Sequence, residues 1–220
     1  MQHIEHVVIS CAGVGSRLGL NLPKCLVELN GRKLIDYQLE LLKGVPDVRV
    51  IVGFKELEVI NHVRKIRPDI TFVRNPDYAS TSNSYSLYLA TRDLRKPFVS
   101  IDGDMIISPR DFKNFMAEGA KAKENIIGIT PAKTTEAIFV RLDKKKRIVE
   151  FTRAPALSHE WCGVAYLRDI KIKSQASFLF NQFINRLPLR SFELACYEID
   201  TPEDLDLAST EAYRLFGNKR

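Results

Sequence analysis

The apolar segments in the first half of this chain alternate between strand-like and helix-like periodicity, and this alternation limits the possible folds more than any other feature. Short β-branched runs that are typical of buried strands occupy residues 7–10, 48–52, 70–73 and 97–101. Segments whose apolar residues recur with a helical period occupy residues 34–42, 56–66 and 84–94. Such alternation predicts an α/β, Rossmann-like fold with a mostly parallel, doubly wound sheet.

The pattern changes after about residue 110, where strand-like segments follow one another with little helix between them. We expect strands over residues 125–130, 137–142, 147–151, 162–167 and 192–199. A long helical pattern covers residues 170–186, and Thr201 followed by Pro202 is typical of a cap and first turn that open a last helix. No linker or repeat divides the chain, so we expect one domain over residues 1–220 with a β-rich second half.

Composition narrows the class of protein. A hydrophobic content of 45% over 220 residues is normal for a soluble globular chain, and the net charge of +6 suits an anionic small molecule. The basic residues are scattered and no nucleic-acid-binding motif occurs, so a nucleic-acid partner is not expected. The four cysteines form no C-x-x-C pair and indicate neither a zinc site nor a disulfide framework. The start is too polar for a signal peptide and no apolar run approaches bilayer length, which favours a cytoplasmic protein without a membrane partner.

A glycine-rich loop directly follows the first expected strand. It runs through Ala12, Gly13, Val14, Gly15 and Ser16. Glycines allow a backbone to approach a ligand closely and turn its N–H groups toward anionic oxygens. Arg17 and Lys24 follow the loop and supply the positive charge that a polyphosphate requires. These features predict a nucleoside triphosphate site, and an ordinary strand-to-helix turn is the alternative interpretation.

Two other phosphate-binding loops do not fit. A Walker loop ends in Gly-Lys-Ser/Thr, whereas Gly19 is followed by Leu20 and Asn21. A dinucleotide fingerprint opens an uninterrupted helix, and Pro23 would stop such a helix soon after the loop. An NADP-binding oxidoreductase is therefore disfavoured.

Carboxylates stand where two further expected strands end. Asp102 and Asp104 follow one apolar strand, and Asp200 follows another just ahead of the last helix. Open α/β sheets place their ligand crevice at such strand ends, and carboxylates from separate strands can share one hard divalent cation. Beside a triphosphate loop, these residues predict a Mg²⁺ site. Capping of the following segment is the alternative role for these aspartates.

Together these motifs resemble the signature of the sugar-nucleotidyltransferase-like NTP transferases. The likeness rests on the segment from Ala12 to Leu18 with Pro23 and Lys24, and on the run from Gly31 to Gln38, and it extends over nearly the whole chain. It implies that Asp104 and Asp200 hold the metal, while Asp102 and the loop bind the nucleotide. It also implies that Arg17 and Lys24 are catalytic. A nucleotide-binding part would cover about residues 1–110 and an acceptor-binding part about residues 111–200.

Within that family, the chain is most similar to bacterial CTP:phosphocholine cytidylyltransferases and their phosphonate-activating relatives. The segment from Asn75 to Leu89 is similar to their N-x-x-Y-x-x-x-N-x-x-S-L-Y-L stretch. The resemblance implies that Asn75, Ser82 and Asn83 lie beside the base. It implies transfer of CMP from CTP to a small phosphorylated or phosphonate acceptor, with release of pyrophosphate. A helix cap is the alternative role of Asn83, and both roles are compatible.

The acceptor side is less defined by the sequence. Arg153 stands near the position of a family lysine, and Glu160, Trp161 and Tyr197 are further candidates for the acceptor pocket. Trp161, Phe151 and Tyr197 would attract a cationic head by cation–π interaction, with Glu160 adding negative charge. A buried core tryptophan is the alternative. Phosphocholine, phosphoethanolamine, 2-aminoethylphosphonate and a sugar 1-phosphate all remain open.

Two other functions stay open at this point. The first is a sugar-1-phosphate nucleotidyltransferase that uses UTP, dTTP or GTP. The second is a noncatalytic nucleotide-binding subunit, which the joint presence of Arg17, Lys24, Asp104 and Asp200 disfavours. Nothing in the sequence decides between a monomer and a homodimer.

Overall fold

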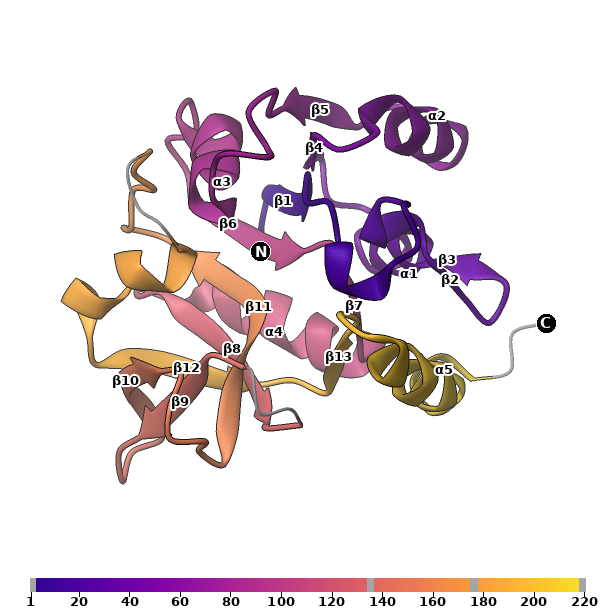
Figure 1. The fold of residues 1–220 in the computed structure, drawn as a ribbon. Coiled ribbons are helices and arrows are strands. Elements are labelled where there is room, and N and C mark those ends of the chain that lie inside the picture. The colour runs from indigo at the N-terminus through magenta and orange to yellow at the C-terminus, as the bar shows by residue number, and fades with distance from the viewer. Residues whose placement is uncertain (1–2, 134–136, 175–177, 218–220) are drawn as a thin grey trace.

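A nine-stranded mixed sheet forms the centre of the molecule, with the strand order β5-β4-β1-β6-β11-β8-β12-β10-β9 (Figure 1). This arrangement is taken from a computed structural model that describes residues 3–133, 137–174 and 178–217. The predicted α/β, Rossmann-like class is confirmed. Within the described residues, no helix combines the length and apolar character needed to cross a bilayer.

The first half of the chain builds the parallel part of the sheet. Its strands are β1 (His6–Cys11), β4 (Asp47–Val52), β5 (Thr71–Arg74) and β6 (Phe98–Asp102). β1 lies between β4 and β6, parallel to both, because each crossover passes through a helix. The crossover helices are α1 (Leu34–Leu41), α2 (Glu56–Ile66) and α3 (Asn83–Thr91). These elements agree with the predicted segments to within a few residues.

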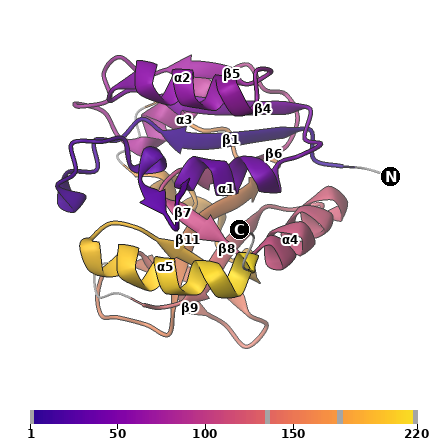
Figure 2. The ribbon, with the colours of Figure 1, turned by 90° about the vertical axis from the view of Figure 1, so that its right-hand side faces the viewer.

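Alternating side chains of the strands divide the core between the two faces of the sheet. Val7 and Ile9 of β1 pack with α1 and α2, whereas Val8 packs with Leu87 and Ala90 of α3. Figure 2 shows α1 and α4 (Pro109–Lys121) along the near face, with α5 (Pro202–Phe216) below them. A third cluster joins α5 to α1 through contacts that include Tyr37, Ile199 and Ala208.

The second half adds strands that are mostly antiparallel to their neighbours. They are β8 (Ile126–Pro131), β9 (Phe139–Leu142), β10 (Arg147–Thr152), β11 (His159–Leu167) and β12 (Leu189–Glu193). β11 joins the two halves, since it pairs antiparallel with both β6 and β8. Two small ribbons stand outside this sheet: β2 (Glu28–Leu29) with β3 (Arg32–Lys33), and β7 (Met105–Ile107) with β13 (Cys196–Glu198).

A bulge in β11 brings this strand close to the end of β6. The pairing with β8 shifts between Trp161 and Ala165, and Gly163 lies in the bulge with φ of 71°. A Cβ atom at Gly163 would lie 2.8 Å from Asp102 Oδ2 and 2.6 Å from Met105 Cε. Glycine is therefore required both by the backbone conformation and by the space beside Asp102.

Two predicted elements are wrong. The pattern over 170–186 is not one helix, because its described part holds only two short 3-10 helices, Leu179–Gln182 and Ile184–Arg186. Gln182 folds the segment back on itself: its Oε1 accepts from the Lys173 backbone N–H at 2.7 Å, and its Nε2 donates to the Lys173 carbonyl at 3.1 Å. Residues 175–177 of this pattern lie outside the described residues.

The expected strand over 192–199 is also divided. Its chain leaves the main sheet after Glu193, and residues 196–198 pair with β7 instead. Helix α4 was not anticipated, although Ser108 caps it and Pro109 occupies its first turn. Its apolar residues Phe112 and Phe115 pack on the sheet.

Thr201 should contribute to stability as the cap of α5. Its hydroxyl accepts from the Asp204 backbone N–H at 3.2 Å, and the Asp204 carboxylate accepts from the Thr201 backbone N–H at 2.9 Å. We expect Thr201→Ala to lower the free energy of unfolding by about 1 kcal/mol in urea denaturation. Thr210→Ala, at an exposed position within the same helix, should change it by less than about 0.5 kcal/mol. Equal effects of the two substitutions would contradict the capping role.

Candidate active site

The glycine-rich loop leaves the carboxyl end of β1, at the edge where β4 and β6 also end. Gly15 has φ of 64°, and a Cβ atom there would lie 2.4 Å from Lys24 Cγ. A side chain at this position would therefore displace the lysine. Ser16 begins the 3-10 helix Ser16–Leu18, and its side chain lies outside the described part of the structure. Gly15 of the predicted loop thus lies against the aliphatic part of the Lys24 side chain.

Lys24 lies between two carboxylates that are far apart in sequence. Its ammonium donates to Asp104 Oδ2 at 3.0 Å and also to Asp200 Oδ1. The side chains of Lys24, Asp104 and Asp200 are only 16%, 21% and 17% exposed. Burial alone would lower the pKa of Lys24, but the charges and hydrogen bonds of both aspartates outweigh burial and raise this pKa to about 12. Lys24 therefore stays protonated at any physiological pH.

Arg17 contacts one of these two carboxylates, that of Asp200. Its Nη2 lies 2.6 Å from Asp200 Oδ2, and the guanidinium is about half exposed. The two predicted catalytic residues and the two predicted metal-binding aspartates are therefore brought together in one cluster.

A third carboxylate, Glu198, joins this cluster and was missed in the sequence. One ligand atom each from Asp104, Glu198 and Asp200 lies within 4.8 Å of the others. Glu198 ends β13 and Asp200 follows two residues later, so the alternation of an extended chain directs both side chains to one side. The two-residue spacing of Glu198 and Asp200 is the sequence signal that could have identified Glu198 as a member of the cluster.

The turn that carries Asp104 is held by backbone and side-chain hydrogen bonds. Gln38 of α1 is fully buried, and its Nε2 donates to the carbonyls of Asp102 at 2.8 Å and Met105 at 3.0 Å. The Gly103 N–H donates to the Ser10 carbonyl at 3.0 Å, and the Ile199 N–H donates to the Asp104 carbonyl at 2.8 Å. The turn is therefore fixed to β1, to α1 and to the segment that carries Glu198 and Asp200.

The electrostatics of the cluster favour a cation in addition to Lys24. Burial, followed by the charge of Asp104, raises the pKa of Asp102 to about 8. Desolvation of the Glu198 carboxylate, followed by the negative charges of Asp104 and Asp200, raises the pKa of Glu198 well above its usual value. Within the described residues, the buried Asp104 Oδ1 has no hydrogen-bond partner. An all-oxygen ligand set with an unpartnered oxygen fits a hard divalent cation such as Mg²⁺.

The predicted base-side residues hold the start of α3. Ser82 Oγ accepts from the Tyr85 N–H at 3.4 Å, and Asn83 Oδ1 accepts from the Leu179 N–H at 3.3 Å. Asn75 is buried, and its Nδ2 donates to Thr81 Oγ1 and Ser86 Oγ. These bonds give the three side chains a role in shaping the loop, and their contact with a base stays a prediction.

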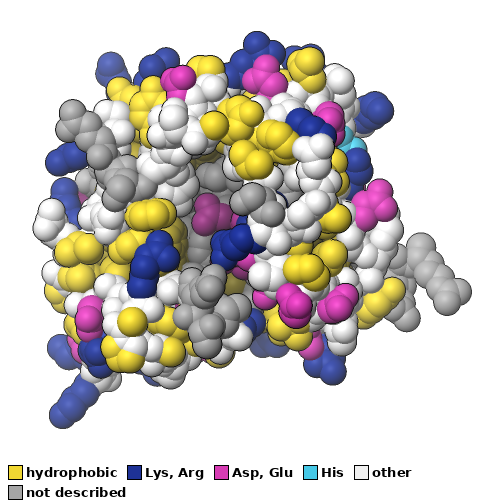
Figure 3. Space-filling model, in the orientation of Figure 1, with side chains coloured by type: hydrophobic (Ala, Val, Ile, Leu, Met, Phe, Trp, Pro, Cys, Tyr) yellow, Lys and Arg dark blue, Asp and Glu magenta, His cyan; other side chains and the backbone are white. Residues whose placement is uncertain are grey.

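A cavity of about 630 Å³ connects the cluster to the predicted acceptor residues. Arg17, Asp102, Glu198 and Asp200 line one part of it, and Asn83 also borders it. The predicted acceptor residues that line it are Arg153, Glu160, Trp161 and Tyr197. Figure 3 shows a hollow near the centre of this face, with acidic and basic side chains inside it. A second cavity of about 230 Å³ lies under the glycine-rich loop, between Gly13, Lys24 and Asp104.

The aromatic residues of the acceptor side differ in their surroundings. Trp161 is 8% exposed and packs edge-on against Phe183 at 5.7 Å between ring centroids, so it is largely a core residue that borders the cavity. Phe151 also packs with Phe183 and Phe180, at 6.0 and 6.3 Å, and is buried. Tyr197 is partly exposed, and the Lys133 ammonium lies 5.0 Å from its ring centroid.

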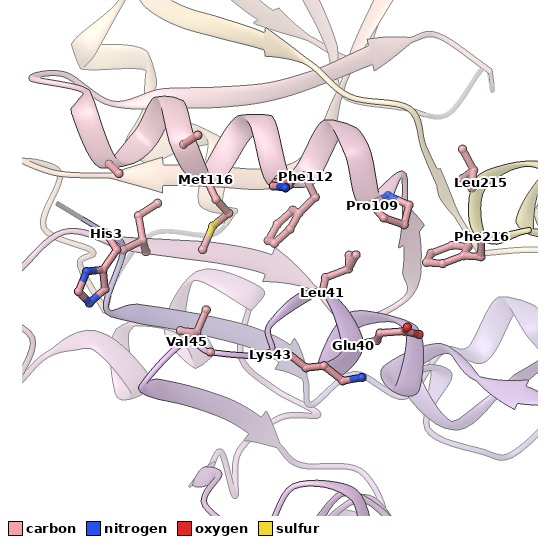
Figure 4. Close-up of a pocket in the computed structure, with 15 residues that line it drawn as sticks. His3, Glu40, Leu41, Lys43, Val45, Pro109, Phe112, Met116, Leu215 and Phe216 are labelled. Atoms are coloured by element: carbon pink, nitrogen blue, oxygen red, sulfur yellow. The ribbon is translucent and has the colours of Figure 1, made fainter. Parts of the chain in front are cut away.

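A larger hollow, of about 1030 Å³, lies away from this cluster. Figure 4 shows it between α1, α4 and the end of α5, with Phe112, Met116 and Phe216 among its labelled residues. The residues predicted for the active site do not line it. The smaller, charged cavity at the strand ends is therefore the candidate site.

Known proteins share both the motifs and the fold of this chain. The profile of the MobA-like NTP transferase domain matches residues 7–162. Choline-phosphate cytidylyltransferase of Streptococcus pneumoniae is 38% identical over 112 residues, which cover 49% of this chain and 48% of that protein. CTP:phosphoglutamine cytidylyltransferase of Campylobacter jejuni is 30% identical over 129 residues, covering 55% of this chain and 50% of that protein. The matched part thus spans about half the length of these curated relatives.

Solved structures extend the likeness to nearly the whole chain. A structure of CTP:phosphocholine cytidylyltransferase from Streptococcus pneumoniae superposes with a TM-score of 0.77 and 25% identity, covering 94% of this chain and 99% of that one. UDP-glucose pyrophosphorylase in complex with UDP-glucose superposes with a TM-score of 0.79 at 17% identity, over 96% of this chain and 99% of that one, which shows a common fold. Because the matched profile includes the glycine-rich loop, Lys24 and Asp104, and covers most of the sequence, this chain belongs to the MobA-like NTP transferase family.

Proposed function

We propose that this protein is a Mg²⁺-dependent cytidylyltransferase that transfers CMP from CTP to a small phosphorylated or phosphonate acceptor and releases pyrophosphate. The observation that carries this proposal is that Lys24, Arg17 and three carboxylates lie together beside the glycine-rich loop. Relatives named as cytidylyltransferases for choline phosphate and phosphoglutamine support the choice of CTP. The motifs favour phosphocholine or 2-aminoethylphosphonate as the type of acceptor.

The chain's own residues would position two anions and neutralise their charge. A phosphate or phosphonate oxygen is nucleophilic at neutral pH, so the reaction needs no general base. The backbone from Ala12 to Ser16 would close over the triphosphate, while Lys24 and Arg17 would stabilise the charge that develops on the departing pyrophosphate. Bound Mg²⁺ would neutralise the phosphate oxygens at the reacting phosphorus. Asp104, Glu198 and Asp200 are the residues that would hold it.

Lys24 also explains how the carboxylates remain together before a metal binds. Its ammonium offsets part of the repulsion between Asp104 and Asp200. A noncatalytic nucleotide-binding subunit would not need a fixed cation among three carboxylates. Enzymatic transfer is therefore the better account of the cluster.

Removal of a metal-site carboxylate should abolish turnover. We expect Asp104→Ala and Asp200→Ala each to lower kcat by a factor of about 10³ or more, because each removes a residue that would hold the Mg²⁺ and so weakens the neutralisation of the triphosphate charge. Pyrophosphate release at saturating CTP and varied Mg²⁺ measures this effect. Asp206→Ala, on the exposed side of α5, is the control and should retain full activity. Substantial Mg²⁺-dependent turnover by either site variant would remove these aspartates from the metal site.

Lys24→Ala should lower the rate by about two to four powers of ten, because the lysine stabilises transition-state charge. The matched control is Lys123→Ala at an exposed position of the surface. Steady-state kinetics with varied CTP and varied acceptor locates the defect. A changed KM for the acceptor with unaltered CTP kinetics would contradict the placement of Lys24 on the nucleotide.

The preference of the enzyme for one nucleobase is a third test of the proposed function. A site formed by backbone groups with Ser82 and Asn83 matches the one amino donor and two acceptors of cytosine, whereas uracil would leave buried groups unpaired at about 1–3 kcal/mol each. We expect kcat/KM for CTP to exceed that for UTP by about tenfold or more, with purine nucleotides disfavoured by size. Equal use of CTP and UTP would favour a sugar-1-phosphate nucleotidyltransferase instead, and the transferase assignment itself would survive.

A further inference from the structure

The aromatic rings on the acceptor side of the cavity already lie close to positively charged side chains of the protein itself. The Arg153 guanidinium lies 4.9 Å from the ring centroid of Phe178 and 5.8 Å from that of Phe180. Lys133 lies over Tyr197 at 5.0 Å. All five side chains line the same cavity of about 630 Å³. A quaternary ammonium placed against these rings would lie beside two positive charges, so the cation–π attraction expected from the sequence would be opposed by repulsion.

Neither of these two cations is paired with a carboxylate of the described residues. Lys133 Nζ donates to neutral oxygens, Thr130 Oγ1 at 2.7 Å and the Pro131 carbonyl at 3.3 Å. Glu160 is the carboxylate beside them in the cavity, and its Oε2 accepts from the Lys133 backbone N–H at 3.3 Å. Among the described residues in this part of the cavity, Arg153 and Lys133 stand beside one carboxylate, Glu160.

Among the described residues, the Arg153 guanidinium lies near the two rings and makes no hydrogen bond to another side chain or to the backbone. Its N–H groups therefore remain available for the two oxygens of a carboxylate, which the guanidinium geometry matches. Arg17 lines the other end of this cavity, and Lys24 lines the second cavity under the glycine-rich loop, where the triphosphate is proposed to bind. A separate anionic group on the acceptor would use the charge of Arg153 and Lys133.

We infer that the acceptor carries a carboxylate beyond its phosphorus-bearing group, bound by Arg153 and Lys133, with its carbon chain against Phe178 and Tyr197. A phosphorylated or phosphonate amino acid fits this description, because Glu160 would accept an ammonium next to the carboxylate. This inference rests on the proposed cytidylyltransferase function. It differs from the sequence-based expectation, because the acceptor would have an anionic or zwitterionic head group in place of a cationic one.

Two matched pairs of acceptors test the inference with the full chain, CTP and Mg²⁺. O-Phosphoserine and O-phosphoethanolamine differ by one carboxylate, and 3-phosphonopropionate and 3-aminopropylphosphonate exchange a carboxylate for an ammonium. We expect kcat/KM for the carboxylate member of each pair to be about tenfold higher or more, the scale of one charged hydrogen bond. Preference for the member without the carboxylate, or for phosphocholine, overturns the inference. Turnover of none of these acceptors contradicts the proposed function itself.

Substitutions at Arg153 separate this role from a contact with the acceptor phosphate. Arg153→Met should reduce the preference for phosphoserine over phosphoethanolamine about tenfold, and Arg153→Glu should reverse it toward phosphoethanolamine. Arg186→Met, an exposed arginine that does not line the cavity, is the control and should keep the wild-type preference. An equal loss with both acceptors in Arg153→Met would assign the arginine to the phosphate that they share, and would overturn the inference.

Discussion

The ion pairing of Lys24 with Asp104 and Asp200 is the interaction on which the site depends. Without a cation, three carboxylates within 4.8 Å would repel one another at the edge of the sheet. The lysine reaches them because Gly15 leaves room for its stem, and Asp104 is positioned because Gln38 and Ser10 hold its turn. Gly15 and Gln38 therefore both support the geometry of this charge cluster, although they lie in different parts of the chain.

The fold brings together residues that the sequence separates. β1 and β6 are parallel neighbours, so the glycine-rich loop and Asp104 meet at one edge of the sheet. The β7–β13 ribbon then carries Glu198 and Asp200 to the same place, and the bulge at Gly163 lets β11 pass close to Asp102. The residues proposed for the acceptor side come later in the chain, from β11 and the segments near residues 133, 153 and 178.

Local signals predicted much of this architecture, and tertiary contacts decided the rest. Short β-branched runs identified the parallel strands, and Thr201 with Pro202 identified the start of α5, because both signals act within a few residues. The pattern over 170–186 was misleading because its apolar residues reach the core without forming one α-helix over the described residues. These residues are Ile170, Ile172, Leu179 and Phe183. Hydrogen bonds between Lys173 and Gln182 hold the segment in this shape. Lys133 and Arg153 could not be assigned to Tyr197 and Phe178 from sequence, since those contacts join distant segments.

Metal binding to the carboxylate cluster tests the central claim most directly. Electron paramagnetic resonance of Mn²⁺, used in place of Mg²⁺ with the wild-type protein and CTP, should show one tightly bound ion per chain. Glu198→Gln should weaken that binding, and Asp104→Ala should abolish it, while circular dichroism shows that both variants remain folded. Tight binding of Mn²⁺ that is unaltered in both variants would contradict the account, because the metal would then be held elsewhere.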